Sequence, residues 1–238
     1  MRLPSYASGI SDVPLLGDTI GANLARTVEA YPDREALVDC PSGRRWSYAE
    51  FGRAVGELAR GLLAAGVGKG DRVGIWAPNC PEWVLVQYAT AAIGAIMVNI
   101  NPAYRRHELE YVLNQSGVSL LVSWPSYRTS DYRSMIEQVR HACPGLRRVV
   151  YIGESSWDDL VAGAVAVPAA RLAERAAQLS CDDPINIQYT SGTTGFRRVR
   201  RCRTTTSSTT ATSSASWSAT RSRTGSACRC RSTTASAW

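Results

Sequence analysis

Apolar and polar positions follow two different periods along most of the chain. Short apolar runs bounded by turn residues are typical of buried strands, whereas apolar residues that recur every three or four positions are typical of helices packed on a core. The runs predict strands at Glu35–Asp39, Val73–Trp76, Ile96–Ile100, Val118–Ser123, Arg148–Ile152 and Ile185–Tyr189. The helical period predicts helices at Asp18–Tyr31, Ser47–Ala65, Glu82–Gly94, His107–Gln115 and Ser130–His141.

This alternation of strands and helices predicts an α/β fold. Consecutive strands joined by helices pair in parallel, so the pattern favours a layered, parallel-rich sheet flanked by helices on both faces. The stretch from Glu154 to Ser180 has a helical pattern broken at Pro168, and we expect it to form a surface connection into the last strand.

Several helix starts are marked by specific residues. Ser47 and Glu50 form a Ser-x-x-Glu capping box, in which each side chain satisfies a free backbone amide. Pro81 suits the first position of a helix because its φ is fixed and it lacks an N–H. Asp18 is predicted to cap the first helix.

The charge of +7 comes from one end of the chain. Nine arginines and no Asp, Glu or Lys lie in 197–238, which leaves 18 basic and 20 acidic residues for the rest. From Arg200 onward there is no Leu, Ile, Val, Met, Phe or Tyr, so this segment has too little apolar surface to offset its ordering entropy. We therefore divide the chain into an extension at 1–17, a folded body at 18–196 and a disordered Ser/Thr/Arg-rich tail at 197–238.

The composition offers little sign of a metal site or a membrane segment. The seven cysteines show no paired metal-ligand spacing, so we interpret them as reduced and structural. The first residues lack the basic start and apolar core of a signal peptide. The longest apolar stretch, Ala89–Ile100, is too short to span a bilayer. A cytoplasmic location is predicted.

The most informative stretch follows the last predicted strand. Its residues are hydroxyl-bearing or glycine, namely Thr190, Ser191, Gly192, Thr193, Thr194 and Gly195. Glycines let the backbone turn close to an anion, and adjacent amides and hydroxyls can donate to phosphate oxygens. The spacing is neither that of the Walker P-loop nor the G-x-G-x-x-G of dinucleotide folds. The alternative is an ordinary solvated loop, because Ser, Thr and Gly are common there.

Tyr189–Gly195 resembles the Y-T-S-G-T-T-G-x-P-K-G signature of adenylate-forming enzymes, the family of acyl-CoA synthetases, firefly luciferase and peptide-synthetase adenylation domains. Four upstream segments occur in the family's order. They are Trp46–Phe51 (W-T-Y-x-E-F), Gly66–Val73 (G-V-x-K-G-D-R-V), Pro78–Trp83 (P-N-x-x-E-W), and Gly94–Ala95 with Asn99–Pro102 (G-A-x-x-x-x-x-N-P). Each also has a simpler reading: the tryptophans as core residues, Gly66–Asp71 as a helix-to-strand turn.

The resemblance implies that 18–196 is an incomplete AMP-binding domain, the N-terminal part of the family's large domain. In that family ATP and a carboxylic acid give an acyl-adenylate and pyrophosphate with Mg²⁺, and coenzyme A then takes the acyl group. Thr190–Gly195 would hold the pyrophosphate end of ATP, and the partners would be small molecules. We expect a fatty-acid CoA ligase, inactive in this truncated form; the alternatives are an aryl-acid ligase and a non-catalytic remnant. No catalytic residue or metal ligand is assigned, and no CoA site.

The resemblance ends abruptly after Phe196. Arg197–Val199 replaces the family's Pro-Lys-Gly, and the tail has no counterpart in the family. A frameshift explains this: if Arg197–Arg200 were encoded CGA AGG GTG CGN and followed a C, the frame one base earlier would read Pro-Lys-Gly-Ala. Sequencing the gene across Phe196 tests this hypothesis. The other reading, a nucleic-acid-binding tail, predicts salt-sensitive DNA retention that is lost when 197–238 is deleted.

Overall fold

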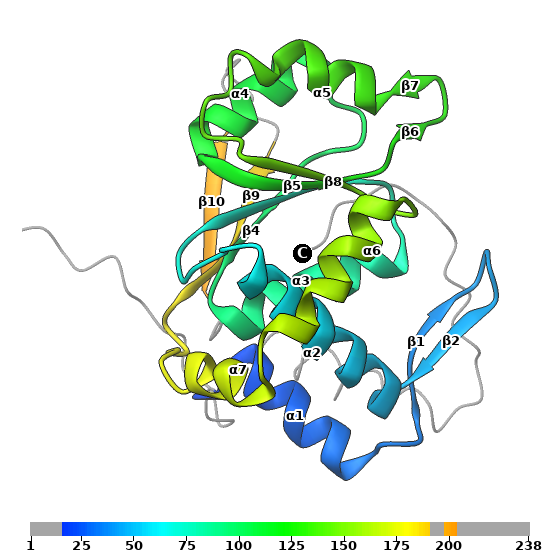
Figure 1. Ribbon diagram of the computed structural model, residues 1–238, viewed down its shortest axis with the longest axis vertical. Helices are drawn as coiled ribbons and strands as arrows, with labels where there is room; N and C mark the ends of the chain where they lie inside the picture. The colour runs from blue at the N-terminus through cyan, green and yellow to red at the C-terminus, as the bar shows by residue number, and fades with distance from the viewer. Residues whose placement is uncertain (1–15, 191–197, 204–238) are drawn as a thin grey trace, which may run out of the picture.

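A six-stranded sheet forms the centre of the molecule (Figure 1). The computed structural model describes residues 16–190 and 198–203. The strand order is β10-β9-β4-β3-β5-β8. The bounds are β3 Arg72–Trp76, β4 Ile96–Asn99, β5 Val118–Ser123, β8 Arg148–Tyr151, β9 Pro184–Thr190 and β10 Arg198–Arg203. Strands β3, β4, β5, β8 and β9 run parallel to one another, and β10 pairs antiparallel with β9. The predicted parallel-rich α/β fold is therefore confirmed.

Helices cover both faces of this sheet. The helices α2 (Tyr48–Ala64), α3 (Pro81–Ile93) and α6 (Ser155–Ala162) pack on one face, and α4 (Arg106–Ser116) and α5 (Tyr132–Arg140) pack on the other (Figure 1). Alternate residues of a strand point to opposite faces. Val73 and Ile75 therefore join the first core, whereas Trp76 joins the second.

Smaller elements surround the sheet. Helix α1 (Ile20–Ala30) packs on α2 and α3, next to a hairpin of β1 (Glu35–Asp39) and β2 (Arg44–Ser47). A second hairpin pairs β6 (Ser126–Tyr127) with β7 (Ser130–Asp131). The connection after α6 contains the 3-10 helix η1 (Gly163–Ala166) and helix α7 (Ala169–Ala176), with the predicted break at Pro168.

The helix starts agree with the sequence in two cases out of three. The capping box at Ser47 and Glu50 is present, and Pro81 is the first residue of α3. The prediction for Asp18 was wrong. Thr19 is the N-cap of α1, with its hydroxyl accepting from the Ala22 amide at 3.2 Å. Asp18 lies one residue too early to cap and pairs with Arg26 instead.

Strand β10 lies in the part of the chain that its composition assigns to the tail. Its backbone pairs with β9 from Arg198 opposite Thr190 to Arg203 opposite Pro184. Residues 198–203 of the predicted tail therefore form a strand, through antiparallel backbone hydrogen bonds that any residue except proline can make. The rest of the predicted tail, residue 197 and residues 204–238, lies outside the described residues.

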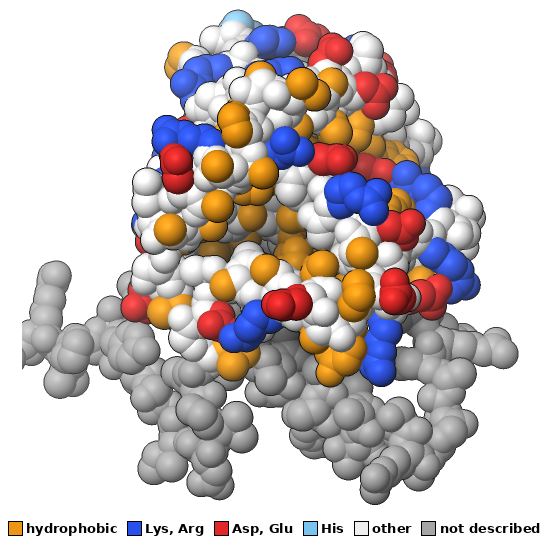
Figure 2. Space-filling view, turned by 60° about the horizontal axis from the view of Figure 1, so that its bottom comes forward, with side chains coloured by type: hydrophobic (Ala, Val, Ile, Leu, Met, Phe, Trp, Pro, Cys, Tyr) orange, Lys and Arg blue, Asp and Glu red, His pale blue; other side chains and the backbone are white. Residues whose placement is uncertain are grey.

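The surface of the body mixes both charge signs. Figure 2 shows one face on which Lys and Arg side chains alternate with Asp and Glu, and hydrophobic side chains gather around a hollow near its middle. Over the described residues this face therefore lacks an extended patch of one sign, in line with the nearly balanced charge outside the tail.

Candidate functional site

The carboxyl ends of five parallel strands meet at one edge of the sheet. Ligands of open α/β sheets commonly bind at this edge, in the loops that leave the strands. Thr190 is the last residue of β9 and therefore lies at this edge. Its register partner Arg198 begins β10, so the intervening segment connects two paired strands. The predicted residues Ser191, Gly192, Thr193, Thr194 and Gly195 lie outside the described residues.

Two other segments that resemble the family start at the same edge. Pro78–Trp83 follows β3 and runs into α3, and Asn99–Pro102 begins in the last residue of β4. Since β4 is the parallel neighbour of β9, Asn99 lies opposite Gln188. The fold thus brings together stretches that are far apart in the sequence, as a shared site at this edge requires.

Backbone hydrogen bonds hold this edge in place. The amide of Ile100 donates to Ile75 O at 3.0 Å, and the amide of Trp124 donates to Trp76 O at 3.2 Å. The hydroxyl of Ser123 is buried and lies 3.1 Å from Trp76 O and 2.8 Å from Trp124 O. The loops after β3, β4 and β5 are therefore fixed relative to one another, which gives a site a rigid base.

Two buried asparagine oxygens near β9 lack a hydrogen-bond partner within the described part of the chain. They are Asn99 Oδ1, at the end of β4, and Asn186 Oδ1, in β9. The register places both on the sheet face that Met97 occupies. An unpaired buried amide oxygen is costly, so it is a candidate contact for a ligand or for a further part of the polypeptide. Sequence analysis missed Asn186, although polar residues alternate with apolar ones along β9.

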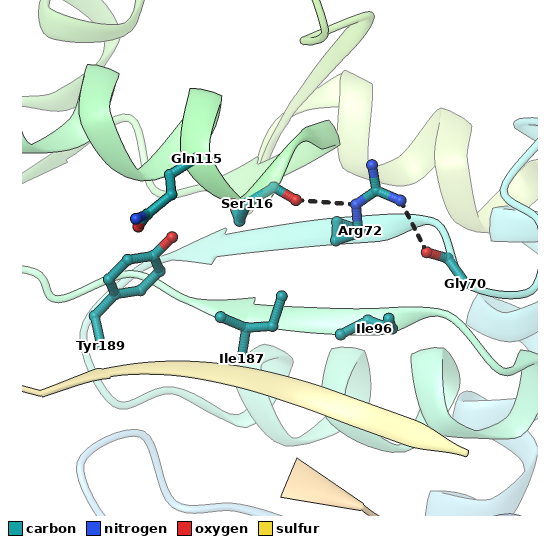
Figure 3. Close-up of a pocket in the computed structure, with 7 residues that line it drawn as sticks. All are labelled: Gly70, Arg72, Ile96, Gln115, Ser116, Ile187 and Tyr189. Atoms are coloured by element: carbon teal, nitrogen blue, oxygen red, sulfur yellow. Dashed lines mark hydrogen bonds between the residues drawn. The ribbon is translucent and has the colours of Figure 1, made fainter. Parts of the chain in front are cut away.

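A separate cleft of about 490 Å³ lies beside α4 (Figure 3). Its lining residues are Gly70, Arg72, Ile96, Gln115, Ser116, Ile187 and Tyr189. Arg72 and Ile96 begin β3 and β4, so one end of the cleft lies at the amino ends of those strands, and its other end reaches Tyr189, the residue before Thr190.

The charged group of this cleft, the Arg72 guanidinium, serves the fold. Arg72 Nε donates to Ser116 O at 2.9 Å, and Nη1 donates to Gly70 O at 3.0 Å. A cation at the end of α4 is favourable because the free carbonyls there carry partial negative charge. Burial raises the pKa of Tyr189, whose hydroxyl stays protonated at neutral pH. We therefore do not assign the triphosphate to this cleft.

The glycine-rich turn before β3 has a structural role. Gly66 and Gly70 both have a φ of +81°, a conformation that favours glycine, and the Gly68 amide donates to Asp71 Oδ2 at 2.8 Å. Lys69 Nζ lies 2.7 Å from Asp183 Oδ2 and donates to Gln178 O at 3.0 Å. The turn thus anchors the segment that enters β9, and its interpretation as a helix-to-strand turn is confirmed.

The cysteines and acidic residues of the described part form no metal site. No group of three or more His, Cys, Asp or Glu residues there is arranged to hold an ion. Burial raises the pKa of Cys80 to about 11, so its thiol is protonated and unreactive at neutral pH. Among the described helices, none has the length and apolar character needed to cross a bilayer.

Comparison with known proteins identifies relatives that agree with the resemblance seen in the sequence. The family model described as AMP-binding enzyme matches residues 24–198. The Bacillus subtilis protein YngI, named as an acyl-CoA synthetase, is 43% identical over 201 residues, covering 76% of this chain and 37% of YngI. The mitochondrial medium-chain acyl-CoA ligase of Danio rerio is 40% identical over 209 residues, covering 80% of this chain and 34% of that protein.

A solved structure shows the same architecture. The Mycobacterium tuberculosis fatty acyl CoA synthetase superposes with a TM-score of 0.70 at 25% identity, over 83% of this chain and 37% of that one. The chain therefore spans between 34% and 37% of the length of these three relatives.

Proposed function

We propose a function from one premise: this chain belongs to the AMP-binding enzyme family. The proposed reaction is ATP-dependent activation of a carboxylic acid, through an acyl-adenylate, followed by transfer of the acyl group to coenzyme A. In this reaction the chain contributes the first part of the large domain and the loop that holds the phosphates of ATP.

The position of Thr190 is the observation that supports this proposal. It ends β9 at the carboxyl edge of a parallel sheet, and the Ser-, Thr- and Gly-rich sequence begins there. Backbone amides and hydroxyls of Thr190–Gly195 would donate to the β- and γ-phosphate oxygens and stabilise the charge that develops on leaving pyrophosphate. ATP, when bound, supplies the adenylyl group that activates the acid.

The described residues fit ATP, Mg²⁺ and coenzyme A to different degrees. The carboxyl edge, where the Asn99 side-chain oxygen has no hydrogen-bond partner among the described residues, suits a polar nucleotide. Mg²⁺ prefers carboxylate and water oxygens, and the described residues offer no acidic cluster for it. We assign no Mg²⁺ or coenzyme A ligand to this part of the chain and no step through either.

A fatty acid is the substrate class that we propose. Relatives with 40–43% identity bear the names of an acyl-CoA synthetase and a medium-chain acyl-CoA ligase. An anthranilate CoA ligase with 25% identity and a TM-score of 0.68 supports the aryl-acid alternative more weakly. Rates with a panel of fatty and aryl acids, measured on the complete enzyme, would separate the two.

We propose that this chain alone does not complete the reaction, since it spans little more than a third of its relatives. Exchange of labelled pyrophosphate into ATP, with a panel of fatty acids, tests this. The expected result is no exchange above background, with exchange restored in a gene corrected to read Pro-Lys-Gly after Phe196. Exchange by the present chain would show that the missing length is dispensable, and failure of the corrected gene would favour the non-catalytic alternative. A cytoplasmic location is the accompanying proposal, and cell fractionation checks it.

A further inference from the structure

Two buried aromatic residues from distant parts of the chain form a stacked pair. Trp76 is the last residue of β3, Tyr132 is the first residue of α5, and both are 0% exposed. Their ring centroids lie 3.8 Å apart at an interplanar angle of 14°. Such a pair is rigid, because each ring restricts the rotamers of the other.

Both polar atoms of this pair donate to the same dipeptide. Trp76 Nε1 lies 3.0 Å from Asn101 O, and Tyr132 Oη lies 2.6 Å from Pro102 O. The Asn101 side chain closes the loop from within, because its Oδ1 accepts from the Ala103 amide at 2.9 Å. Burial raises the pKa of Tyr132 to about 12, so the phenol remains a donor at every physiological pH. The loop after β4 is thus held by these three hydrogen bonds and by a fourth, from the Tyr104 amide to Asn101 O at 3.0 Å.

This loop lies next to the start of the predicted phosphate loop. The parallel register of β4 and β9 reaches Asn99 opposite Gln188. Asn101 follows the last residue of β4 by two positions, and Thr190 follows Gln188 by two positions in β9, so both lie just beyond this last pair, at the carboxyl edge. We therefore expect a shift of the Asn101–Pro102 backbone to change the position of Thr190.

We propose that Trp76 and Tyr132 are positioning residues for the nucleotide site: by fixing Asn101 and Pro102 they fix the place where the phosphate loop leaves β9. This inference rests on the proposed function. The effect of both side chains passes through the backbone of the loop after β4, without a contact to ATP.

Substitutions that remove one donor and keep the ring test the proposal. Tyr132→Phe removes the hydrogen bond to Pro102 O and retains the stack. The matched control is Tyr151→Phe, because the Tyr151 hydroxyl is also buried but has no hydrogen-bond partner among residues 16–190 and 198–203. Trp76→Phe, which removes the other donor, provides a second variant. Melting temperatures establish that each full chain is folded under the conditions used.

Two readouts are measured on each variant: the affinity for Mg·ATP, and amide hydrogen exchange in 99–104 and 188–190. We expect Tyr132→Phe to weaken Mg·ATP binding roughly five-fold, the equivalent of one neutral hydrogen bond, and to speed exchange in both segments. Tyr151→Phe should change neither.

The two readouts separate this inference from the proposed function. Absence of Mg·ATP binding in the unsubstituted chain counts against the proposed function. In that case, amide hydrogen exchange in 188–190 alone decides whether the aromatic pair positions the end of β9. Faster exchange confined to 99–104, with 188–190 unchanged, would show that the aromatic pair only stabilises its own loop and would overturn the proposal. An equal response in Tyr151→Phe would overturn it as well.

Discussion

The contact between α2 and α6 depends on the absence of a side chain at Gly61. This residue is buried in α2, and a Cβ there would lie 2.1 Å from the carbonyl oxygen of Leu160 and 3.1 Å from its carbonyl carbon. Both are backbone atoms of a residue that is 1% exposed, so they cannot swing aside as the end of a flexible side chain would. Gly61→Ala must therefore push α6 away from α2.

The expected magnitude follows from two opposing effects. Alanine in a helix interior is favoured over glycine by roughly 1 kcal/mol, whereas overpacking a core costs about 1–3 kcal/mol or more. Because the clash is with backbone atoms, we place the overpacking cost at the upper end of its range. After the gain in helix propensity is subtracted, we expect Gly61→Ala to lower the free energy of unfolding by about 2 kcal/mol.

Gly56 is the matched control, since it lies in the same helix and a Cβ there would meet no atom within 4 Å. Gly56→Ala should raise the free energy of unfolding by roughly 0.5–1 kcal/mol. Urea denaturation followed by far-UV circular dichroism measures both variants. Stabilisation by Gly61→Ala, or a similar response of the two variants, would refute the close packing of α6 on α2.

Three further perturbations have expected outcomes. Ser47→Ala removes half of the capping box of α2 and should lower the free energy of unfolding by about 1 kcal/mol; an unchanged urea midpoint would contradict the cap. The hydrogen bond from Lys69 holds the pKa of Asp183 below its usual value, so the unfolded chain binds more protons in acid and stability falls as pH falls through that range. Lys69→Met should weaken this dependence of stability on pH, measured by melting at several acidic pH values. An unchanged dependence would contradict the ion pair of Lys69 with Asp183. Iodoacetamide at neutral pH should modify exposed Cys40 before Cys80, whose pKa is about 11, and peptide mass mapping that finds Cys80 modified as fast would count against its burial.

The sequence predicted the central sheet well because its strands are buried runs with clear ends. It predicted the start of α2 because the capping box is a local interaction. The hairpins β1–β2 and β6–β7 were incompletely predicted, since residues such as Arg44 and Ser126 are exposed and leave no apolar period. Composition did not predict β10, whose backbone pairs with β9.

Of the candidate site, the structure describes Thr190 at the end of β9, whereas the phosphate loop that follows stays a prediction. The hydroxyl- and glycine-rich sequence predicted a phosphate loop after the last strand, and Thr190 does end that strand at the carboxyl edge. The stack of Trp76 on Tyr132, and its two hydrogen bonds to the loop after β4, depend on a tertiary contact between distant residues. A single sequence has no local signal for such a contact.

Titration of the purified chain with Mg·ATP tests the central claim, that Thr190–Gly195 holds the pyrophosphate end of ATP. We expect saturable binding that pyrophosphate displaces and adenosine does not, and that is lost in Thr193→Ala/Thr194→Ala. The matched variant Thr209→Ala/Thr210→Ala, which alters an adjacent threonine pair further along the chain, should bind as before. Absence of binding, displacement by adenosine alone, or equal affinity in the two double variants would contradict the claim.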